Sequence, residues 1–322
     1  MQFCKSASYY NLRFLFKIVF CCTLFISGNI SSQELFPNSE PASLIPKRVF
    51  GIRLMNEFYR EISERKTWQD VMLMYGISSK FMIIGSFSFS NHHGSSLPND
   101  FIENDGSIGL HTHGVKKGNS YSYKQESYGL GFRYRFFNRD GHHEHFRMAL
   151  YGNAVYADQA HDEAETNLMG DNSGLGGGII ATVLKKKLAI SFTGGGIFPK
   201  PYTDKSKDIT LLYGNAYNYS LSFGYLMLPF KYKSYDQTNL NFYAEFLGKS
   251  YDALKVYQNN NRILVDGVPS FEKGNYVEFR PAIQLIIKSS LRIDISRSFP
   301  MLSRSYVRTY PAYNLNIQYY FL

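Results

Sequence analysis

The chain has 322 residues, of which 44% are hydrophobic, 16% aromatic and 19% charged, with 35 basic residues against 26 acidic ones. This length allows one large domain or two ordinary ones, and the 26 Phe, 26 Tyr and 26 Gly residues favour β-strands over long helices. A mean hydropathy of −0.26 excludes a polytopic helical membrane protein, because each helical span needs about 20 mostly apolar residues. The aromatic content excludes a disordered chain.

The first 32 residues have the pattern of a secretory signal peptide. Three basic residues precede an apolar stretch at 18–27, and small and polar residues follow it. About ten apolar residues are too few to span a membrane, so a transmembrane anchor is not expected. We predict cleavage after Gly28 or after Ser32.

All three cysteines, Cys4, Cys21 and Cys22, lie in this segment. The mature chain would therefore have no disulfide, no thiolate nucleophile and no cysteine-based metal site. Removing the segment also removes three basic residues and leaves 32 basic against 26 acidic ones. This excess is spread along the chain without a basic run, so no nucleic-acid partner is expected.

Residues 33–47 contain Pro37, Pro41 and Pro46, and we predict an extended periplasmic linker there. From residue 48 to residue 322 the sequence repeats a unit of alternating apolar and polar residues followed by a turn, which predicts β-strands in a single domain. The twelve expected strands are 49–59, 68–77, 81–90, 127–137, 145–156, 174–184, 188–198, 215–228, 238–251, 275–287, 291–299 and 313–322.

The alternation gives each expected strand an apolar face and a polar face. In 127–137, for example, Tyr128, Leu130 and Phe132 alternate with Gly129 and Arg133. A barrel in lipid turns its apolar face outward and its polar face toward the lumen. The charged residues expected to line the lumen are Arg53, Glu57, Asp70, Arg133, Arg135, Arg147, Glu245, Glu278, Arg280, Arg292 and Asp294.

The lengths of the connections form a second pattern. Short links such as 78–80 and 185–187 alternate with long ones, led by 91–126 and 252–274. Such alternation around an even number of strands is typical of bacterial outer-membrane barrels, whose short turns face the periplasm. We therefore predict an all-β fold, a transmembrane antiparallel up-and-down barrel of about 12 strands in the outer membrane of a Gram-negative bacterium.

The alternative is a soluble β-sandwich or barrel with its apolar face in a dry core. Two observations favour the membrane barrel. The apolar faces are rich in aromatic residues, as at a lipid interface, and the polar faces carry Arg and Glu at strand centres, where a hydrated lumen tolerates them.

The C-terminal stretch resembles the targeting strand of outer-membrane proteins. Its alternating residues are Tyr313, Leu315, Ile317, Tyr319 and Phe321. It departs from that pattern at Leu322, one residue beyond the expected terminal aromatic. The resemblance implies partners in the barrel-assembly machinery, outer-membrane lipid and lipopolysaccharide.

The segment 74–81, Met-Tyr-Gly-Ile-Ser-Ser-Lys-Phe, resembles a strand–turn–strand motif of one group of proteins. That group is the outer-membrane transporter-like barrels linked with the MetA pathway of phenol degradation. Loop fragments at 91–93 and 160–165 are similar to those of uncharacterised outer-membrane proteins of the Bacteroidetes. The resemblance implies an outer-membrane barrel with a transport role and supplies no substrate.

Histidines are concentrated in the expected loops, together with acidic residues. Imidazole and carboxylate ligands together suit Zn, Cu or Ni. The candidate ligands of a divalent metal over the barrel mouth are His92, His93, His111, His113, His161, Asp162 and Glu163. The alternative is that solvated loops simply carry polar residues.

Two other patterns have plain interpretations. The stretch 91–96, Asn-His-His-Gly-Ser-Ser, combines serine with histidine, but neighbours in a loop seldom reach the geometry of a hydrolase. No enzyme activity, catalytic residue or cofactor is therefore expected. The glycine runs 176–178 and 194–196 continue into strands rather than helices, so they are predicted to relieve crowding in a small barrel, not to bind phosphate.

Function depends on the expected lumen. Six arginines and five carboxylates in a narrow twelve-strand barrel either pair and largely occlude it or form charge ladders around a polar pore. We predict a narrow channel or transporter for a small polar or anionic solute. The alternative is a non-conducting surface barrel that binds a ligand or a divalent metal through its extracellular loops.

Overall fold

The computed structural model of the chain describes residues 36–61, 64–94, 96–97, 101–102, 121–141, 144–231, 234, 236–264 and 268–321. The expected signal peptide lies outside these residues. Within the described part of the chain, no helix is long and apolar enough to cross a membrane.

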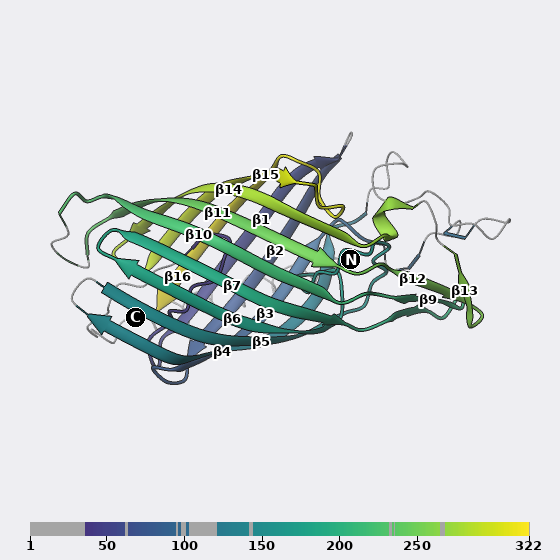
Figure 1. Cartoon of the computed structure of the whole chain (residues 1–322), viewed down its shortest axis with the longest axis horizontal. Helices are drawn as coiled ribbons and strands as arrows, with labels where there is room; N and C mark the ends of the chain where they lie inside the picture. Colours follow the sequence, from purple (N-terminus) through teal and green to yellow (C-terminus); the bar gives the residue numbers. More distant parts are fainter. Residues whose placement is uncertain are drawn as a thin grey trace, which may run out of the picture.

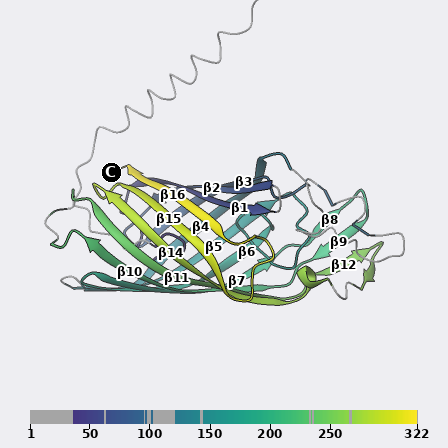
Figure 2. The same cartoon turned by 90° about the horizontal axis from the view of Figure 1, so that it is seen from above.

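Twelve antiparallel strands close into a barrel (Figures 1 and 2), in which the first strand pairs with the last. The strands are β1 (Phe50–Glu61), β2 (Glu64–Gly76), β3 (Phe81–Ser90), β4 (Lys124–Gly141), β5 (Glu144–Ala157), β6 (Gly174–Lys185), β7 (Leu188–Pro199), β10 (Ala216–Leu228), β11 (Asn239–Tyr251), β14 (Gly274–Ile287), β15 (Leu291–Leu302) and β16 (Ala312–Phe321). The predicted fold class and number of strands are confirmed.

The alternation of the sequence determines which side of the barrel each residue faces. The apolar series stays exposed on the outer surface, where Leu130 is 67% and Ile295 61% exposed. The polar series is buried, with Glu245 at 0% and Arg292 at 3%. Tyr128 and Phe132, which a soluble sandwich would place in a dry core, lie on the exposed side. An outward apolar band with an inward polar face is the arrangement that lipid requires.

The two glycine runs face each other across β6 and β7, where Gly178 pairs with Gly195 and Gly177 with Gly196. The Tyr151 side chain from β5 lies over them, and a Cβ on Gly195 would overlap its hydroxyl. The glycines therefore allow the close approach of a large side chain inside the barrel, as the crowding interpretation predicted.

Two long connections add a second sheet beyond one end of the barrel (Figures 1 and 2). Its strands are β8 (Tyr202–Asp204), β9 (Ile209–Leu212), β12 (Lys255–Gln258) and β13 (Asn261–Ile263), and the 3₁₀ helix η1 (Pro269–Phe271) follows. Leu211, Val256 and Phe271 are at most 1% exposed and pack with Leu97 and Phe101 from another loop. The long connections at this end, the long-loop end, thus have an apolar core of their own. The opposite end is the short-turn end.

Candidate functional site

The lumen contains the charged residues that the sequence predicted for it. Ten of the eleven are at most 8% exposed, on strands from all sides of the barrel. The exception is Arg135, which is half-buried at the short-turn end and donates to the Ser79 carbonyl at 2.6 Å. A β-bulge between Arg135 and Phe137 interrupts the regular alternation of β4 at this point.

The N-terminal segment that was predicted as a periplasmic linker lies inside the barrel. We refer to residues 36–47 as the plug segment. Phe36 and Ala42 are 2% and 0% exposed, and the backbone N–H of Arg48 donates to the Gly76 carbonyl at 2.7 Å at the short-turn end. The linker prediction is wrong for these residues. Buried backbone N–H and C=O groups need hydrogen-bond partners, and the side chains of the lumen supply them, so the segment can lie inside the barrel.

Glu245, at the centre of β11, holds the tip of the plug segment. Its Oε2 accepts from the Asn38 backbone N–H at 3.0 Å and from the Asn38 side chain at 2.6 Å. Its Oε1 accepts from the Ser39 backbone N–H at 2.9 Å. The Ser39 hydroxyl also contacts the Ser222 hydroxyl of β10 at 2.8 Å.

Two lumen arginines hold the same segment from the other side. Arg53 donates to the Pro37 carbonyl at 2.6 Å and pairs with Glu40 at 3.3 Å. Arg133 donates to the Pro41 carbonyl at 3.1 Å and pairs with Glu40 at 2.5 Å. Pairing with carboxylates of other strands was one of the two arrangements considered for these arginines, but the plug segment supplies their partners instead.

Further contacts come from β5 and β6. The Arg147 guanidinium donates to the Ser43 hydroxyl at 2.9 Å, and the Ala42 backbone N–H donates to the Thr182 hydroxyl at 2.9 Å. Ser191 of β7, Ser296 of β15 and Asn316 of β16 also donate to the segment. The plug segment therefore has partners on nine of the twelve barrel strands, which surround it. The charged lining of the lumen is a binding surface for this segment.

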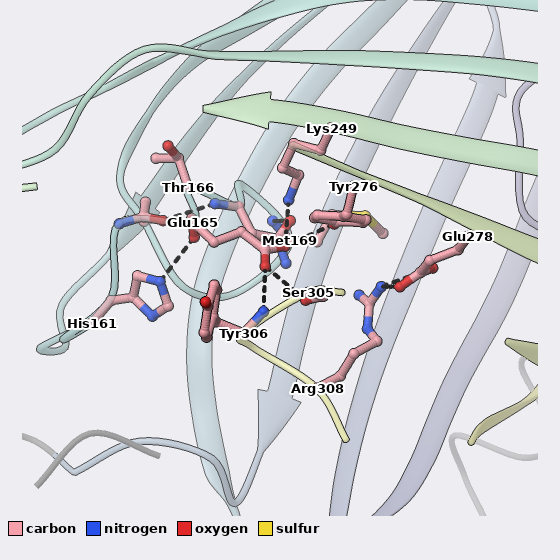
Figure 3. A network of polar contacts seen from close by, with 12 residues as sticks. His161, Glu165, Thr166, Met169, Lys249, Tyr276, Glu278, Ser305, Tyr306 and Arg308 are labelled. Atoms are coloured by element: carbon pink, nitrogen blue, oxygen red, sulfur yellow. Dashed lines mark hydrogen bonds and ion pairs between the residues drawn. The ribbon is translucent and has the colours of Figure 1, made fainter. Parts of the chain in front are cut away.

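The long-loop end is covered by residues 158–173, which we call the mouth loop. Its Glu165 is 1% exposed and accepts hydrogen bonds from four donors on three other parts of the chain (Figure 3). The donors are the Lys249 ammonium at 3.2 Å, the Tyr276 hydroxyl at 2.7 Å, the Ser305 hydroxyl at 2.7 Å and the Tyr306 backbone N–H at 3.0 Å. Burial opposes the charged form of Glu165, but the nearby cations and these donors outweigh it and lower the pKa of its carboxyl.

A second connection, 303–311, also folds into the mouth and brings Arg308 into the lumen (Figure 3). Arg308 pairs with Glu57 at 2.9 Å and with Glu278 at 2.9 Å, and Glu278 also pairs with Arg280 at 2.7 Å. Arg308 was not among the predicted lumen residues, because a loop residue has no alternation from which its direction could be predicted. Lys249 was missed although it shares the inward parity of Glu245 on β11.

A cavity of about 390 Å³ lies between the plug segment and the mouth loop. Its lining includes Asn38 and Glu40 below, Asp171 and Arg308 above, and Asp70 on the barrel wall. The structure therefore has a chamber with a mixed polar and apolar lining inside the barrel, with the plug segment at one end and the mouth loop at the other.

The predicted metal ligands are only partly brought together. Nε2 of His93 lies 3.2 Å from Nδ1 of His161, and Asp171, which was not predicted, completes a group whose ligand atoms are all within 4.8 Å. His92 instead contacts the Tyr59 ring at 5.2 Å between centroids. The other predicted ligands do not join the group: Asp162 and Glu163 lie outside it, and His111 and His113 lie outside the described residues.

These groups are buried in the mouth rather than solvated, since His93, His161 and Asp171 are at most 3% exposed. Burial lowers the pKa of His161. For His93, burial acts in the same direction but is outweighed by the hydrogen bond to Glu126 and the charge of Asp171, which raise its pKa.

The C-terminal alternation is found in β16, where Tyr313, Ile317 and Tyr319 are exposed on the outer face. The barrel closes there by pairing β16 with β1. Recognition of this strand by assembly machinery stays a prediction.

Neither a protein-family profile nor a curated protein matches the sequence. Among solved structures, an outer membrane channel from Pseudomonas putida F1 has a TM-score of 0.52 at 11% identity, over 89% of this chain and 99% of that one. The KdgM porin has a TM-score of 0.42 at 6% identity, over 84% of this chain and 98% of that one. The narrower resemblances, to the phenol-degradation transporters and to Bacteroidetes proteins, stay predictions. The chain has the fold of a bacterial outer-membrane β-barrel, closed from twelve antiparallel strands.

Proposed function

We propose that this chain is a non-enzymatic outer-membrane channel for a small polar or anionic solute, held closed by its own plug segment. The observation that carries the proposal is the chamber of about 390 Å³ in the lumen, separated from the short-turn end by the plug segment. The outward apolar band supports a place in lipid. A solute entering from the long-loop end would reach the chamber and continue only when the plug segment moves.

The polar contacts of the plug segment can be exchanged for water. They are hydrogen bonds and ion pairs, such as Glu245 with Ser39 and Arg133 with Pro41. A hydrogen bond to a charged group contributes only about 1.5–3 kcal/mol net, because water replaces it when it breaks. Polar groups exposed by departure of the segment would face a hydrated lumen.

Departure of the plug segment would also change the charge of the lumen. Glu40, which pairs with both Arg53 and Arg133, would leave with it. The opened lumen would then contain two arginines without this carboxylate, and positive charge along a narrow pore favours anions. This supports a preference for anionic over cationic solutes.

Conductance in planar lipid bilayers tests the proposal. The mature barrel should open rarely, and a variant lacking residues 36–45 should show frequent discrete conductance steps with an anion-selective reversal potential in a salt gradient. Folding of both proteins is checked by the change in gel mobility on boiling.

The competing function is a non-conducting barrel that binds ligands at its mouth, and the coverage of both ends of the chamber favours it. A folded deletion variant that stays silent in bilayers would contradict the channel proposal and support this alternative. A cation-selective conductance would keep the channel and reject the anionic solute.

A further inference from the structure

A buried group of three side chains in the mouth has the composition and spacing of a metal site. We propose that His93 Nε2, His161 Nδ1 and the Asp171 carboxylate bind one divalent transition-metal ion of the zinc type. This goes beyond the channel function and does not depend on whether the barrel conducts.

The distances suit such an ion. Nε2 of His93 lies 3.2 Å from Nδ1 of His161 and 3.8 Å from Oδ1 of Asp171. Ligand atoms about 2.1 Å from a tetrahedral zinc ion lie about 3.4 Å from one another. All three ligand atoms lie within 4.8 Å of one another, so the two nitrogens are already at the required separation and the Asp171 carboxylate would move toward them to share a central cation. A fourth position would stay open.

The hydrogen bonds of the two rings orient them for metal binding. Nδ1 of His93 is 3.3 Å from Oε1 of Glu126, and Nε2 of His161 is 2.9 Å from the Glu165 carbonyl. Because both partners are acceptors, these outer nitrogens carry the protons of the neutral rings. The inner nitrogens then face each other with lone pairs at 3.2 Å, where a metal ion can bind both in place of the proton that would otherwise join them. Outer-shell acceptors of this kind are usual behind metal-bound histidines.

The carboxylate adds an independent observation. Asp171 is 3% exposed, and its Oδ2 has no hydrogen-bond partner among the described residues. A buried carboxylate oxygen without a donor is costly unless a cation balances it. With Glu126 behind His93, two carboxylates surround two neutral rings, so a charge of +2 fits this group better than a single shared proton.

The site would connect two parts of the mouth. His93 follows β3, whereas His161 and Asp171 belong to the mouth loop. The single tryptophan of the chain reports on this loop, because the Trp68 indole N–H donates to the Met169 carbonyl at 2.6 Å. Metal binding should therefore alter tryptophan fluorescence.

Zinc titration of the purified mature barrel in detergent, after treatment with a chelator, tests the proposal. Calorimetry should give one Zn²⁺ per chain, and Co²⁺ should produce the visible absorption of a tetrahedral ion and quench Trp68. Glu126→Gln should weaken binding by about 10–100-fold, and Asp171→Asn or His161→Gln by more. The matched control is His145→Gln, since His145 pairs with Asp140 at 2.9 Å on another part of the barrel.

Absence of Zn²⁺ and Co²⁺ binding to the folded wild-type barrel would overturn the proposal, and the lone pairs would then share a proton. Binding that His145→Gln weakens as much as Asp171→Asn would also overturn it. Should the histidine variants fail to fold, the Co²⁺ spectrum of the wild type and the effect of Glu126→Gln still decide the question.

Discussion

The plug segment and the mouth loop enter the lumen from opposite ends and are held in different ways. The plug segment has polar contacts with nine strands around the barrel, such as Ala42 with Thr182 and Arg147 with Ser43. The mouth loop has its polar contacts concentrated on Glu165, which accepts from four donors. The plug segment is thus held by contacts spread around the barrel, whereas the polar contacts of the mouth loop converge on one residue. This difference decides which of the two elements can move.

Both elements also have apolar contacts, but of different extent. Phe36, Ala42, Leu44 and Ile45 of the plug segment pack in three small clusters with side chains of the barrel. Ala164 and Leu168 of the mouth loop belong to the large apolar cluster of the long-loop end, and the loop is continuous with β5 before it and β6 after it. Moving this loop would expose apolar surface and strain two connections. We infer that the plug segment is the element that moves and that the mouth loop is a fixed part of the chamber.

The strongest test of this comparison fixes the plug segment covalently. The Ser39 and Ser222 hydroxyls are 2.8 Å apart, so the double substitution Ser39→Cys with Ser222→Cys places two thiols near disulfide distance. All native cysteines lie in the expected signal peptide, so the pair would be alone in the mature chain. We expect no bilayer conductance under oxidising conditions and wild-type openings after reduction.

The single substitution Ser222→Cys is the control, and its conductance should not respond to reductant. Full conductance in the oxidised double variant would show that ions bypass the plug segment and would reverse the comparison.

A smaller effect is expected when one contact of the plug segment is removed. Arg133→Ala removes the hydrogen bond to the Pro41 carbonyl and the ion pair with Glu40. Hydrogen bonds to charged groups contribute about 1.5–3 kcal/mol each, so open probability should rise by about tenfold or more. Single-channel recording measures this change.

The matched control is Arg135→Ala, two residues further along β4. The Arg135 guanidinium donates to the Ser79 carbonyl in a turn, so its removal should leave gating at the wild-type level. Equal effects of the two substitutions would mean that lumen charge, rather than contact with the plug segment, controls opening.

The sequence predicted the barrel well because its rules are local and repeated. A strand that spans lipid must alternate along its whole length, so the inward direction of Arg133 or Glu278 follows from parity alone. Lys249 could have been assigned to the lumen in the same way. The expected alternation of short and long links likewise matches the barrel, which has a short-turn end and a long-loop end.

What fills the lumen could not be predicted in this way. Glu40, Glu165 and Arg308 lie in segments without periodicity, and their positions depend on partners far along the chain: Arg133 for Glu40, 93 residues away, Tyr306 for Glu165, 141 residues away, and Glu57 for Arg308, 251 residues away. The metal hypothesis shows the same limit. Composition suggested His93 and His161, but only the folded mouth loop brings Asp171 to them.

The smallest effect on conductance is expected for Glu165→Gln in the mouth loop. Glutamine has nearly the same volume, but it cannot accept from all four donors and leaves the Lys249 ammonium without its carboxylate partner. Local opening of the loop should become easier by about 1.5–3 kcal/mol, seen as faster amide hydrogen exchange across 158–173. Because the plug segment does not contact this residue in the mouth, open probability should stay near the wild-type value.

Glu144→Gln is the corresponding control, since Glu144 pairs with Lys185 at 3.5 Å with both side chains more than half exposed. Such surface pairs contribute about 0–1 kcal/mol, so exchange in the mouth loop should not change. A large rise in conductance for Glu165→Gln would contradict the division of roles, because it would make the mouth loop a second gate. Faster exchange without a rise in conductance would separate the stability of the chamber wall from the movement that opens it.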